Sequence, residues 1–273
     1  MKRYFDKWKT VFREHKILFF VDLFFVAGVI SVAVSQFFSE NYYDVFLCFI
    51  TFLMFLIPPM VSRHSKVYLP DALQIIIVLF IFSAQILGEI REYYLYYSFW
   101  DTALHTVNGF LCGVIGFAVV NVLHNSERFY VSLSPLFLAM FGFCFSMTIG
   151  VCWEFIEFTM DRLFLTDMQK DIFLDSVSSI LLNPEGTNDA VTLEIESLSL
   201  NNGAYEFPKY IDIGLTDTMK DLLVNFIGAF LSGIVGFFYA KGESKTGLFA
   251  GLLPHVKEKL TGKEKTSYDK GSD

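Results

Sequence analysis

Charged residues are scarce in this chain. They make up 18% of its 273 residues, whereas hydrophobic residues make up 53%. A soluble domain carries more charge, about 25%. The mean hydropathy is +0.47, and several apolar runs reach the ~20 residues that a helix needs to cross a bilayer. The composition therefore excludes an ordinary soluble enzyme and predicts an all-α integral membrane protein.

An excess of positive charge is also missing, because the net charge is −8. This argues against nucleic acid as a partner. Cysteine is rare and shows no CxxC spacing, which excludes a disulfide framework or a cysteine zinc site. All four cysteines fall inside apolar runs and are expected to be small core residues; they are Cys48, Cys112, Cys144 and Cys152.

Six apolar runs predict a bundle of six transmembrane helices within a single membrane domain, residues 1–273. The first run follows a basic segment and resembles a secretory signal, but it is long and Asp22 interrupts it, so we expect a retained helix. No internal repeat or second domain is visible. The predicted helices cover about 17–38, 43–61, 70–90, 101–124, 134–158 and 217–240.

A polar insert, residues 159–216, separates the last two helices. Residues 171–182 have apolar side chains at helical spacing, and Val191, Leu193 and Ile195 alternate with polar residues as in a strand. Asn201-Asn202-Gly203 is typical of a tight turn. The insert is therefore predicted to be a small helix-plus-hairpin structure, and residues 241–273 to be a basic tail.

The distribution of positive charge predicts the orientation. With six spans, both termini lie on one side of the membrane, and that side collects sixteen of the 21 Lys and Arg residues. The positive-inside rule places it in the cytoplasm. The N and C termini and the tail are then cytoplasmic, and the insert is extracytoplasmic.

Polar residues of several helices fall at the same, extracytoplasmic end of this topology. Helical spacing puts Asp101, His105 and Asn108 within about 60° of arc. The other polar residues lie at the end of the fifth span and the start of the sixth; they are Glu154, Glu157, Asp217, Asp221 and Asn225. A charge at the bilayer centre costs about 2.5–3.5 kcal/mol, so these groups must face one another or water.

One histidine among several carboxylates suits a divalent cation such as Mg²⁺, Mn²⁺ or Zn²⁺. The same set without a metal could form an acid–base pair with His105 as the titrating member. In a simpler alternative, Asp101 and Asp217 are only first-turn acids favoured by the helix dipole. The predicted metal ligands are Asp101, His105, Glu154, Asp217 and Asp221; the predicted catalytic groups are His105, Asp101, Glu154 and Glu157; Asn108 and Asn225 are predicted to bind substrate.

Glycines recur in the two helices that carry most of these groups. Small residues let transmembrane helices approach closely, so we expect tight packing of the fourth and sixth spans. The glycines are Gly109, Gly113 and Gly116 in the fourth span and Gly228, Gly233 and Gly236 in the sixth.

Three segments resemble the YjdF-like family of bacterial inner-membrane proteins: WDTALHTVNG (100–109), WEFIE (153–157) and DTMKDLLVNFIGA (217–229). The resemblance implies a shared fold and site in a bacterial cytoplasmic membrane, without a known chemistry. A weaker resemblance to VanZ-like membrane proteins rests on a DxxxH pair, Asp101 and His105, and on a DxxxNxxG pattern from Asp221 to Gly228. Glu157 stands where the VanZ-like pattern has Gln, and the long insert is a further departure.

Three functions stay open at this point. The first is a metal-assisted hydrolase or transferase that acts on a lipid or lipid-linked substrate at the outer leaflet. The second is an accessory or binding protein of the cell envelope, and the third is an ion-coupled transporter. The inner half of the bundle has few polar residues apart from Asp22 and Gln74, which argues against transport.

Overall fold

A computed structural model describes residues 15–64, 67–124, 133–242 and 248–256. Six helices in these ranges are long and apolar enough to cross a membrane, which confirms the predicted six-helix membrane fold. The basic N-terminal segment and most of the predicted tail lie outside the described residues. The candidate spans are Lys16–Phe38, Tyr42–Ser62, Asp71–Ile90, Trp100–Asn121, Pro135–Phe164 and Leu215–Lys241.

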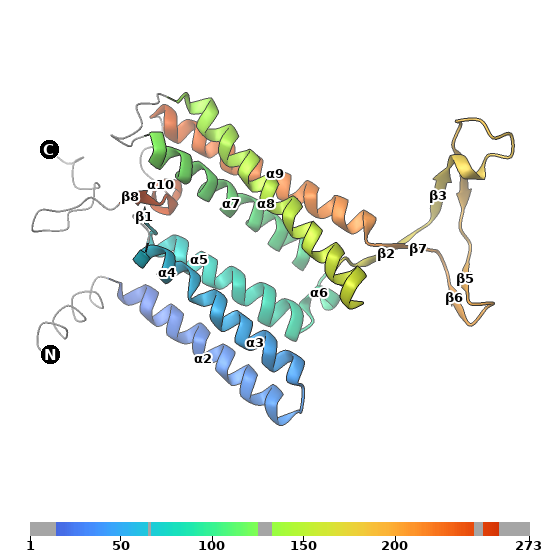
Figure 1. Cartoon of the computed structure of the whole chain (residues 1–273), viewed down its shortest axis with the longest axis horizontal. Coiled ribbons are helices and arrows are strands. Elements are labelled where there is room, and N and C mark those ends of the chain that lie inside the picture. The colour runs from blue at the N-terminus through green and yellow to red at the C-terminus, as the bar shows by residue number, and fades with distance from the viewer. Residues whose placement is uncertain (1–14, 65–66, 125–132, 243–247, 257–273) are drawn as a thin grey trace, which may run out of the picture. The chain divides into compact units, whose positions relative to one another are not determined.

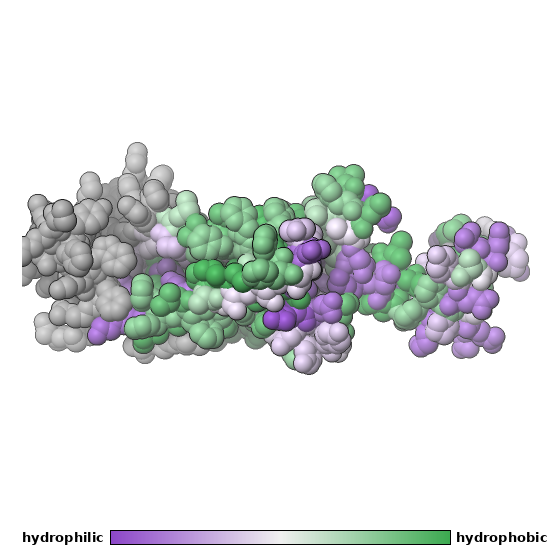
Figure 2. All heavy atoms as spheres, turned by 90° about the horizontal axis from the view of Figure 1, so that it is seen from below, coloured by the Kyte–Doolittle hydropathy of each residue, from purple (hydrophilic) through white to green (hydrophobic). Residues whose placement is uncertain are grey.

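The chain forms two compact units. One comprises Met1–Met147 with Asn225–Asp273, and the other Thr148–Val224. Helix α8 (Pro135–Phe164) and helix α9 (Leu215–Lys241) each contribute residues to both units. On the face displayed in Figure 2, hydrophobic side chains cover much of the helical surface, whereas hydrophilic side chains gather around the strands.

Three helices of the first unit, α2 (Lys16–Phe38), α3 (Tyr42–Phe55) and α5 (Asp71–Phe82), lie side by side (Figure 1). They bury one apolar core, and helix α4 (Ile57–His64) follows α3 at the proline pair Pro58-Pro59. Proline is tolerated in the first turn of a helix, because a backbone N–H at that position would have no hydrogen-bond acceptor within the helix. The buried members of this core are Val29, Cys48, Phe55, Val78, Ile81, Ile86 and Ile90.

Helix α5 continues as a π-helical segment, Ser83–Ile90, which is followed by the short helix α6 (Tyr93–Tyr96) and then by α7 (Trp100–His124). The Trp100 indole nitrogen donates to the Ser83 carbonyl oxygen at 3.3 Å. The first residue of α7 is therefore tied to the end of α5, and the residues that follow Trp100 are held in place.

A second core joins α7 to α5, α8 and the short helix α10 (Leu248–Leu252). Phe117 of α7 is 1% exposed and Leu73 of α5 is fully buried. A two-residue strand pair, β1 (Val67–Tyr68) with β8 (His255–Val256), joins the segment before α5 to the chain after α10. The buried residues of this core are Leu69, Leu73, Leu111, Val114, Phe117, Ala118, Val120, Leu138, Leu252 and Leu253.

Helices α7 and α9 approach each other closely enough that only glycine fits at two points. A Cβ atom at Gly109 would overlap the backbone of Asn225, and one at Gly228 would overlap the backbone of Thr106. Farther along, a Cβ atom at Gly113 would overlap the Ser232 side chain, and one at Gly236 would overlap the Phe117 ring. Residue numbers therefore rise together along α7 and α9, so the two helices run in parallel. The close packing expected from the glycines is present, and it fixes which residues of α7 face which residues of α9.

The second unit contains the polar insert, which is built of strands. Strand β2 (Asp171–Leu174) pairs with β7 (Tyr210–Ile213), and β3 (Ser176–Ser179) pairs with β4 (Val191–Glu194). The helix predicted over residues 171–182 is not formed, apart from one 3₁₀ turn at Ile180–Leu182. Burial alternates along β2 and β3, so the apolar residues there fit a strand once a pairing partner is available.

The hairpin predicted around Asn201-Asn202-Gly203 is confirmed. Strands β5 (Leu198–Leu200) and β6 (Tyr205–Phe207) pair in antiparallel fashion. All three turn residues have positive φ angles, 53°, 55° and 86°. Asparagine and glycine tolerate this left-handed conformation better than other residues. The strand predicted near Val191 is likewise present as β4.

Candidate metal centre

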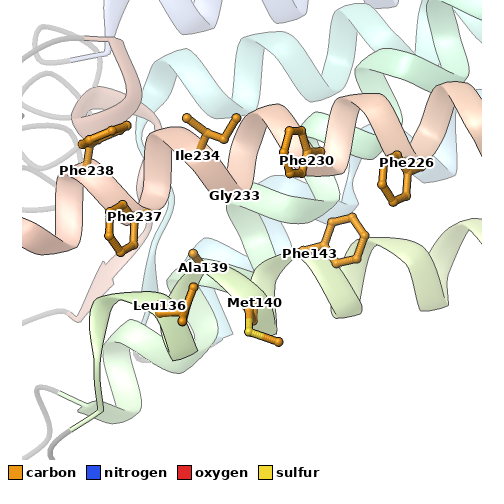
Figure 3. A pocket seen from close by; sticks show the side chains of 10 residues that line it. All are labelled: Leu136, Ala139, Met140, Phe143, Phe226, Phe230, Gly233, Ile234, Phe237 and Phe238. Carbon is orange, nitrogen blue, oxygen red and sulfur yellow. The ribbon is translucent and has the colours of Figure 1, made fainter.

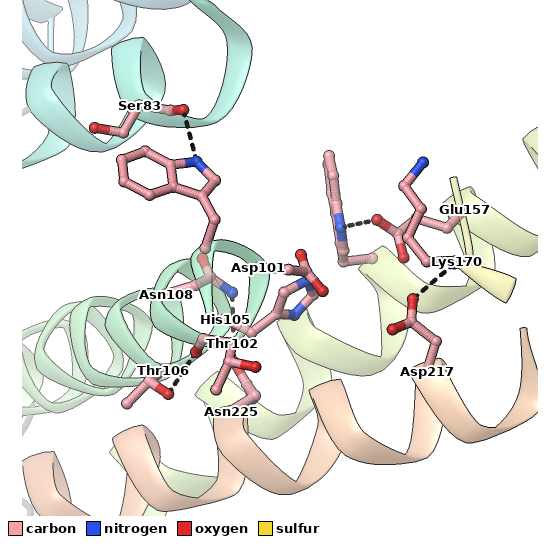
Figure 4. A network of polar contacts seen from close by, with 12 residues as sticks. Ser83, Asp101, Thr102, His105, Thr106, Asn108, Glu157, Lys170, Asp217 and Asn225 are labelled. Atoms are coloured by element: carbon pink, nitrogen blue, oxygen red, sulfur yellow. Dashed lines mark hydrogen bonds and ion pairs between the residues drawn. The ribbon is translucent and has the colours of Figure 1, made fainter. Parts of the chain in front are cut away.

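The first two residues of the candidate site lie one turn apart at the start of α7. The Nε2 atom of His105 is 3.4 Å from Oδ1 of Asp101 (Figure 4), and the two side chains are 11% and 21% exposed. Positions i and i+4 of a helix share one face, so the sequence spacing alone brings this carboxylate to this imidazole. A carboxylate beside a histidine orients the ring and strengthens it as a ligand.

The third residue, Asp221, comes from α9 and is 1% exposed. It precedes Asn225 by one turn of the same helix, and the backbone of Asn225 meets Gly109 of α7. The parallel packing thus directs the turn before Asn225 toward the turn before Gly109, which contains His105. One ligand atom from each of Asp101, His105 and Asp221 lies within 4.8 Å of the other two. This is the one such group of three His, Cys, Asp or Glu residues found in the described part of the chain.

One imidazole and two carboxylates form a donor set that divalent cations accept. Mg²⁺ and Mn²⁺ prefer oxygen ligands, whereas Zn²⁺ and Mn²⁺ also accept imidazole. The spacing of the three ligand atoms is compatible with a single ion at their centre. Three protein ligands also leave coordination positions for water or substrate, as in catalytic sites.

Asn108 and Asn225, both predicted to bind substrate, bond to each other. The Nδ2 atom of Asn108 donates to Oδ1 of Asn225 at 3.4 Å, and the Asn225 side chain is 1% exposed. The Asn225 amide also contacts Sδ of Met147 in α8 at 3.6 Å, and Cys112 contacts Oδ1 of Asn108 at 3.5 Å. The sequence interpretation missed Cys112 and Met147. Cys112 could have been found from its i+4 spacing to Asn108, whereas nothing in the sequence points to Met147.

Glu154 and Glu157 lie on α8 within the second unit, and they are 4% and 8% exposed. The Trp153 indole nitrogen donates to Oε1 of Glu157 at 2.7 Å. The polar group of Trp153 thus binds a buried carboxylate of its own helix. The catalytic roles predicted for both residues, and the metal-binding role predicted for Glu154, stay predictions.

Asp217 has a structural partner inside the second unit. Its Oδ2 accepts a hydrogen bond from the backbone N–H of Lys170 at 2.8 Å (Figure 4), and its side chain is 4% exposed. Gln169 also bonds to the Thr218 hydroxyl. Asp217 therefore fastens the first turn of α9 to the segment before β2. This bond agrees with the simpler alternative of a first-turn acid, and the predicted metal role of Asp217 stays a prediction.

A carboxylate of the same unit, Asp161, holds the loop that follows α8. It accepts hydrogen bonds from the Thr166 hydroxyl at 2.8 Å and from the backbone N–H groups of Met168 and Gln169 at 2.7 and 2.9 Å. At the start of β2, the pKa of the Asp171 carboxyl is raised. The main cause is partial shielding of this group from water, and the nearby carboxylate of Asp167 adds to the shift. The hydrogen bonds of Asp161 therefore organise the entrance to the insert.

A separate polar group occurs in α2 and α5. The Nδ1 atom of His15, the residue before α2, is 2.8 Å from both carboxylate oxygens of Asp71 in α5. Asp22, in α2, has one buried carboxylate oxygen without a hydrogen bond. The Gln74 amide donates to the Leu69 carbonyl oxygen at 2.8 Å, so this buried polar side chain supports the backbone.

Comparison with known proteins gives one match. Residues 20–242 fit the family described as "Predicted membrane protein (DUF2238)". The match agrees with the resemblance to a bacterial membrane family at this coarse level. No curated protein and no solved structure matches the chain.

Proposed function

Since the chain belongs to this family of predicted membrane proteins, we propose that it is a membrane enzyme that binds a divalent cation at Asp101, His105 and Asp221. We further propose that it carries out metal-assisted hydrolysis or group transfer on a lipid or lipid-linked substrate. One observation carries the proposal: the ligand atoms of these three residues lie within 4.8 Å of one another.

The orientation is part of the proposal. Most of the Lys and Arg residues belong to loops on the side of the termini, which supports cytoplasmic termini in a bacterial cytoplasmic membrane. The starts of α7 and α9 then lie at the extracytoplasmic end of the bundle. A cation one or two turns inside these helices would be at the depth where lipid headgroups meet acyl chains.

Each residue of the proposed site has a separate proposed role. Asp101, His105 and Asp221 would hold the cation, which would supply Lewis-acid activation of a bound water or phosphoryl oxygen. Glu154 and Glu157 are the proposed acid–base groups, with Glu154 and Asp217 as further candidate ligands. Asn108 and Asn225, already bonded to each other, would orient the substrate.

We also propose that the chain is a YjdF-like protein within this family. The WDTALHTVNG segment and the later DTMKDLLVNFIGA segment support a YjdF-like protein. The DxxxH and DxxxNxxG patterns shared with VanZ-like proteins include His105, Asp221 and Asn225, three residues of the proposed site. This suggests a common binding site and leaves the substrate open.

The accessory and transport alternatives have less support. The group of His15, Asp71 and Asp22 is the feature that would favour a proton or cation path. The bond from Gln74 to the Leu69 carbonyl oxygen removes one of the two inner polar residues from such a path. An accessory protein would not need ligand atoms this close together at one buried point.

Metal dependence tests the proposed activity. The full chain would be purified in mild detergent, treated with a chelator and incubated with the polar lipids of a bacterial cytoplasmic membrane, with and without Mg²⁺, Mn²⁺ or Zn²⁺. Mass spectrometry of the lipids should show a product that requires one of these ions. As a control, Asp175→Asn removes an exposed carboxylate of the insert and should leave turnover unchanged. A product formed equally well without metal would contradict the proposal.

A further inference from the structure

A second feature of the first unit is an apolar groove between α8 and α9. Its volume is about 730 Å³, and no polar surface lines it. Ligand pockets commonly measure roughly 300–1,000 Å³. In Figure 3 the rings of Phe143, Phe226 and Phe230 line one part of the groove, and Leu136 and Phe237 lie farther along the same two helices.

Helix α9 carries this groove and the polar groups on different faces. At 100° per residue, Asp221, Asn225 and Gly228 lie within about 60° of arc. Phe226, Phe230, Gly233 and Phe237 share another arc of about 60°, centred roughly 140° away. The face with Asp221, Asn225 and Gly228 packs against α7 at Gly228, whereas Phe226 and Phe230 of the other face are 42% and 53% exposed.

We propose that this groove seats one acyl chain of the lipid substrate. Both of its walls belong to candidate membrane spans, so its open side is continuous with the surface that faces the hydrocarbon of the bilayer. From Phe226 to Phe238 the groove extends about 18 Å along α9, more than half of a hydrocarbon core of ~30 Å. The length, the apolar lining and the opening toward the bilayer fit a single hydrocarbon chain.

Aromatic rings give the groove a defined shape at one end. Phe143 of α8 and Phe226 of α9 meet edge to face, with ring centroids 5.2 Å apart, and Phe230 stacks on Phe226 at 6.0 Å. Packed aromatic pairs are stiffer than aliphatic walls of similar area, because an aromatic side chain has few rotatable bonds. These rings keep the space between the two helices open to a slender chain.

The same end of the groove leads to the polar residues. One turn beyond Phe143 on α8 lies Met147, which contacts Asn225, the neighbour of Phe226. An acyl chain in the groove would therefore have its headgroup end at the level of Met147 and Asn225 along the two helices. In this respect the inference rests on the proposed function, because it names the part of the substrate that lies inside the membrane.

Gly233 provides a way to close the groove without disturbing α7. A Cβ atom there would be 3.7 Å from the Ala139 carbonyl oxygen and 4.0 Å from Cβ of Phe143, both ordinary contact distances. Gly233→Ala should therefore fold as the natural protein does. Gly233→Leu should fill the groove, and Met140→Trp would fill it from the α8 side.

The experiment uses phosphatidylglycerol with a diazirine in one acyl chain, reconstituted with the full chain in vesicles. A diazirine near the headgroup should label Phe143 and Phe226, and one at the chain end should label Leu136 and Phe237. Phe24 of α2, 71% exposed, reports labelling by bulk lipid. Gly233→Leu or Met140→Trp should lower groove labelling relative to Phe24 by roughly tenfold, which corresponds to about 1.4 kcal/mol.

Groove labelling no stronger than that of Phe24, or unaffected by both filling variants, would overturn the inference. A His105→Ala variant separates this test from the proposed function. Groove labelling that persists in His105→Ala would show that the groove does not depend on the cation site. A natural protein that binds no metal but is labelled in the groove would reject the cation site alone, whereas bound metal with an unlabelled groove would reject the groove alone.

Discussion

His105→Ala and Asp221→Ala are each expected to reduce turnover of the lipid substrate by a factor of roughly 10²–10⁴, the range for loss of one positioned catalytic group. His105 is the only imidazole of the proposed site, and Asp221 is the more deeply buried of its two carboxylates, at 1% exposed. Either change leaves two ligands, which is too few to hold a divalent ion firmly in place. Lipid mass spectrometry on matched amounts of protein would measure the loss.

A matched set of variants separates ligation from a structural role. Asp221→Asn preserves shape and should also lose turnover, because a neutral amide is a weaker ligand than a carboxylate. Excess Mn²⁺ or Zn²⁺ should partly restore Asp221→Asn, since weakened binding responds to concentration. Full turnover in both alanine variants, with thermal unfolding unchanged, would remove these residues from the active site.

Gly228→Ala is expected to lower the free energy of unfolding by about 1–3 kcal/mol, the cost of overpacking a tight interface. The added Cβ atom would meet the Thr106 carbonyl oxygen and the Phe110 amide of α7, and a backbone cannot rotate away as a side chain can. The α7–α9 register would shift, and His105 and Asp221 would move apart. The melting temperature in detergent should fall by roughly 2–4 °C per kcal/mol.

Gly233→Ala is the control on the same helix. Its new methyl group would sit at 3.7 Å or more from its neighbours, so the melting temperature should stay within a degree or so of the natural protein, as for most substitutions away from tight contacts. Equal melting temperatures for both alanine variants would contradict the close approach of α7 and α9.

The spans were predictable because the signal is local. A run such as residues 17–38 is long and apolar enough to identify itself, and Asn201-Asn202-Gly203 specifies its own turn. The face that each span buries was not predictable in this way. Cys48 is buried as expected, but Cys144 and Cys152 are exposed on the isolated chain. A membrane helix is apolar on its lipid-facing side as well as its packed side, so an apolar run does not distinguish the two.

Pairing between distant segments explains the largest error of the sequence interpretation. Residues 171–174 form β2 because Tyr210–Ile213 lies beside them. The local sequence pattern does not indicate a pairing partner nearly 40 residues away. The role of Asp161 was not predictable for a similar reason, since its carboxylate binds a loop that begins several residues later. The i+4 pair of Asp101 and His105 is the opposite case: helix geometry alone brings the two side chains together.

The most direct measurement of the central claim is the metal content of the purified chain by elemental mass spectrometry, with Asp175→Asn as control and the double variant His105→Ala, Asp221→Ala alongside. Each protein would be measured as isolated and after loading with Mn²⁺ or Zn²⁺. We expect about one ion per chain in the natural and control proteins and none in the double variant, as ligand loss requires. No bound ion in the natural protein after loading, or an equal amount in the double variant, would contradict the claim that Asp101, His105 and Asp221 form a cation site.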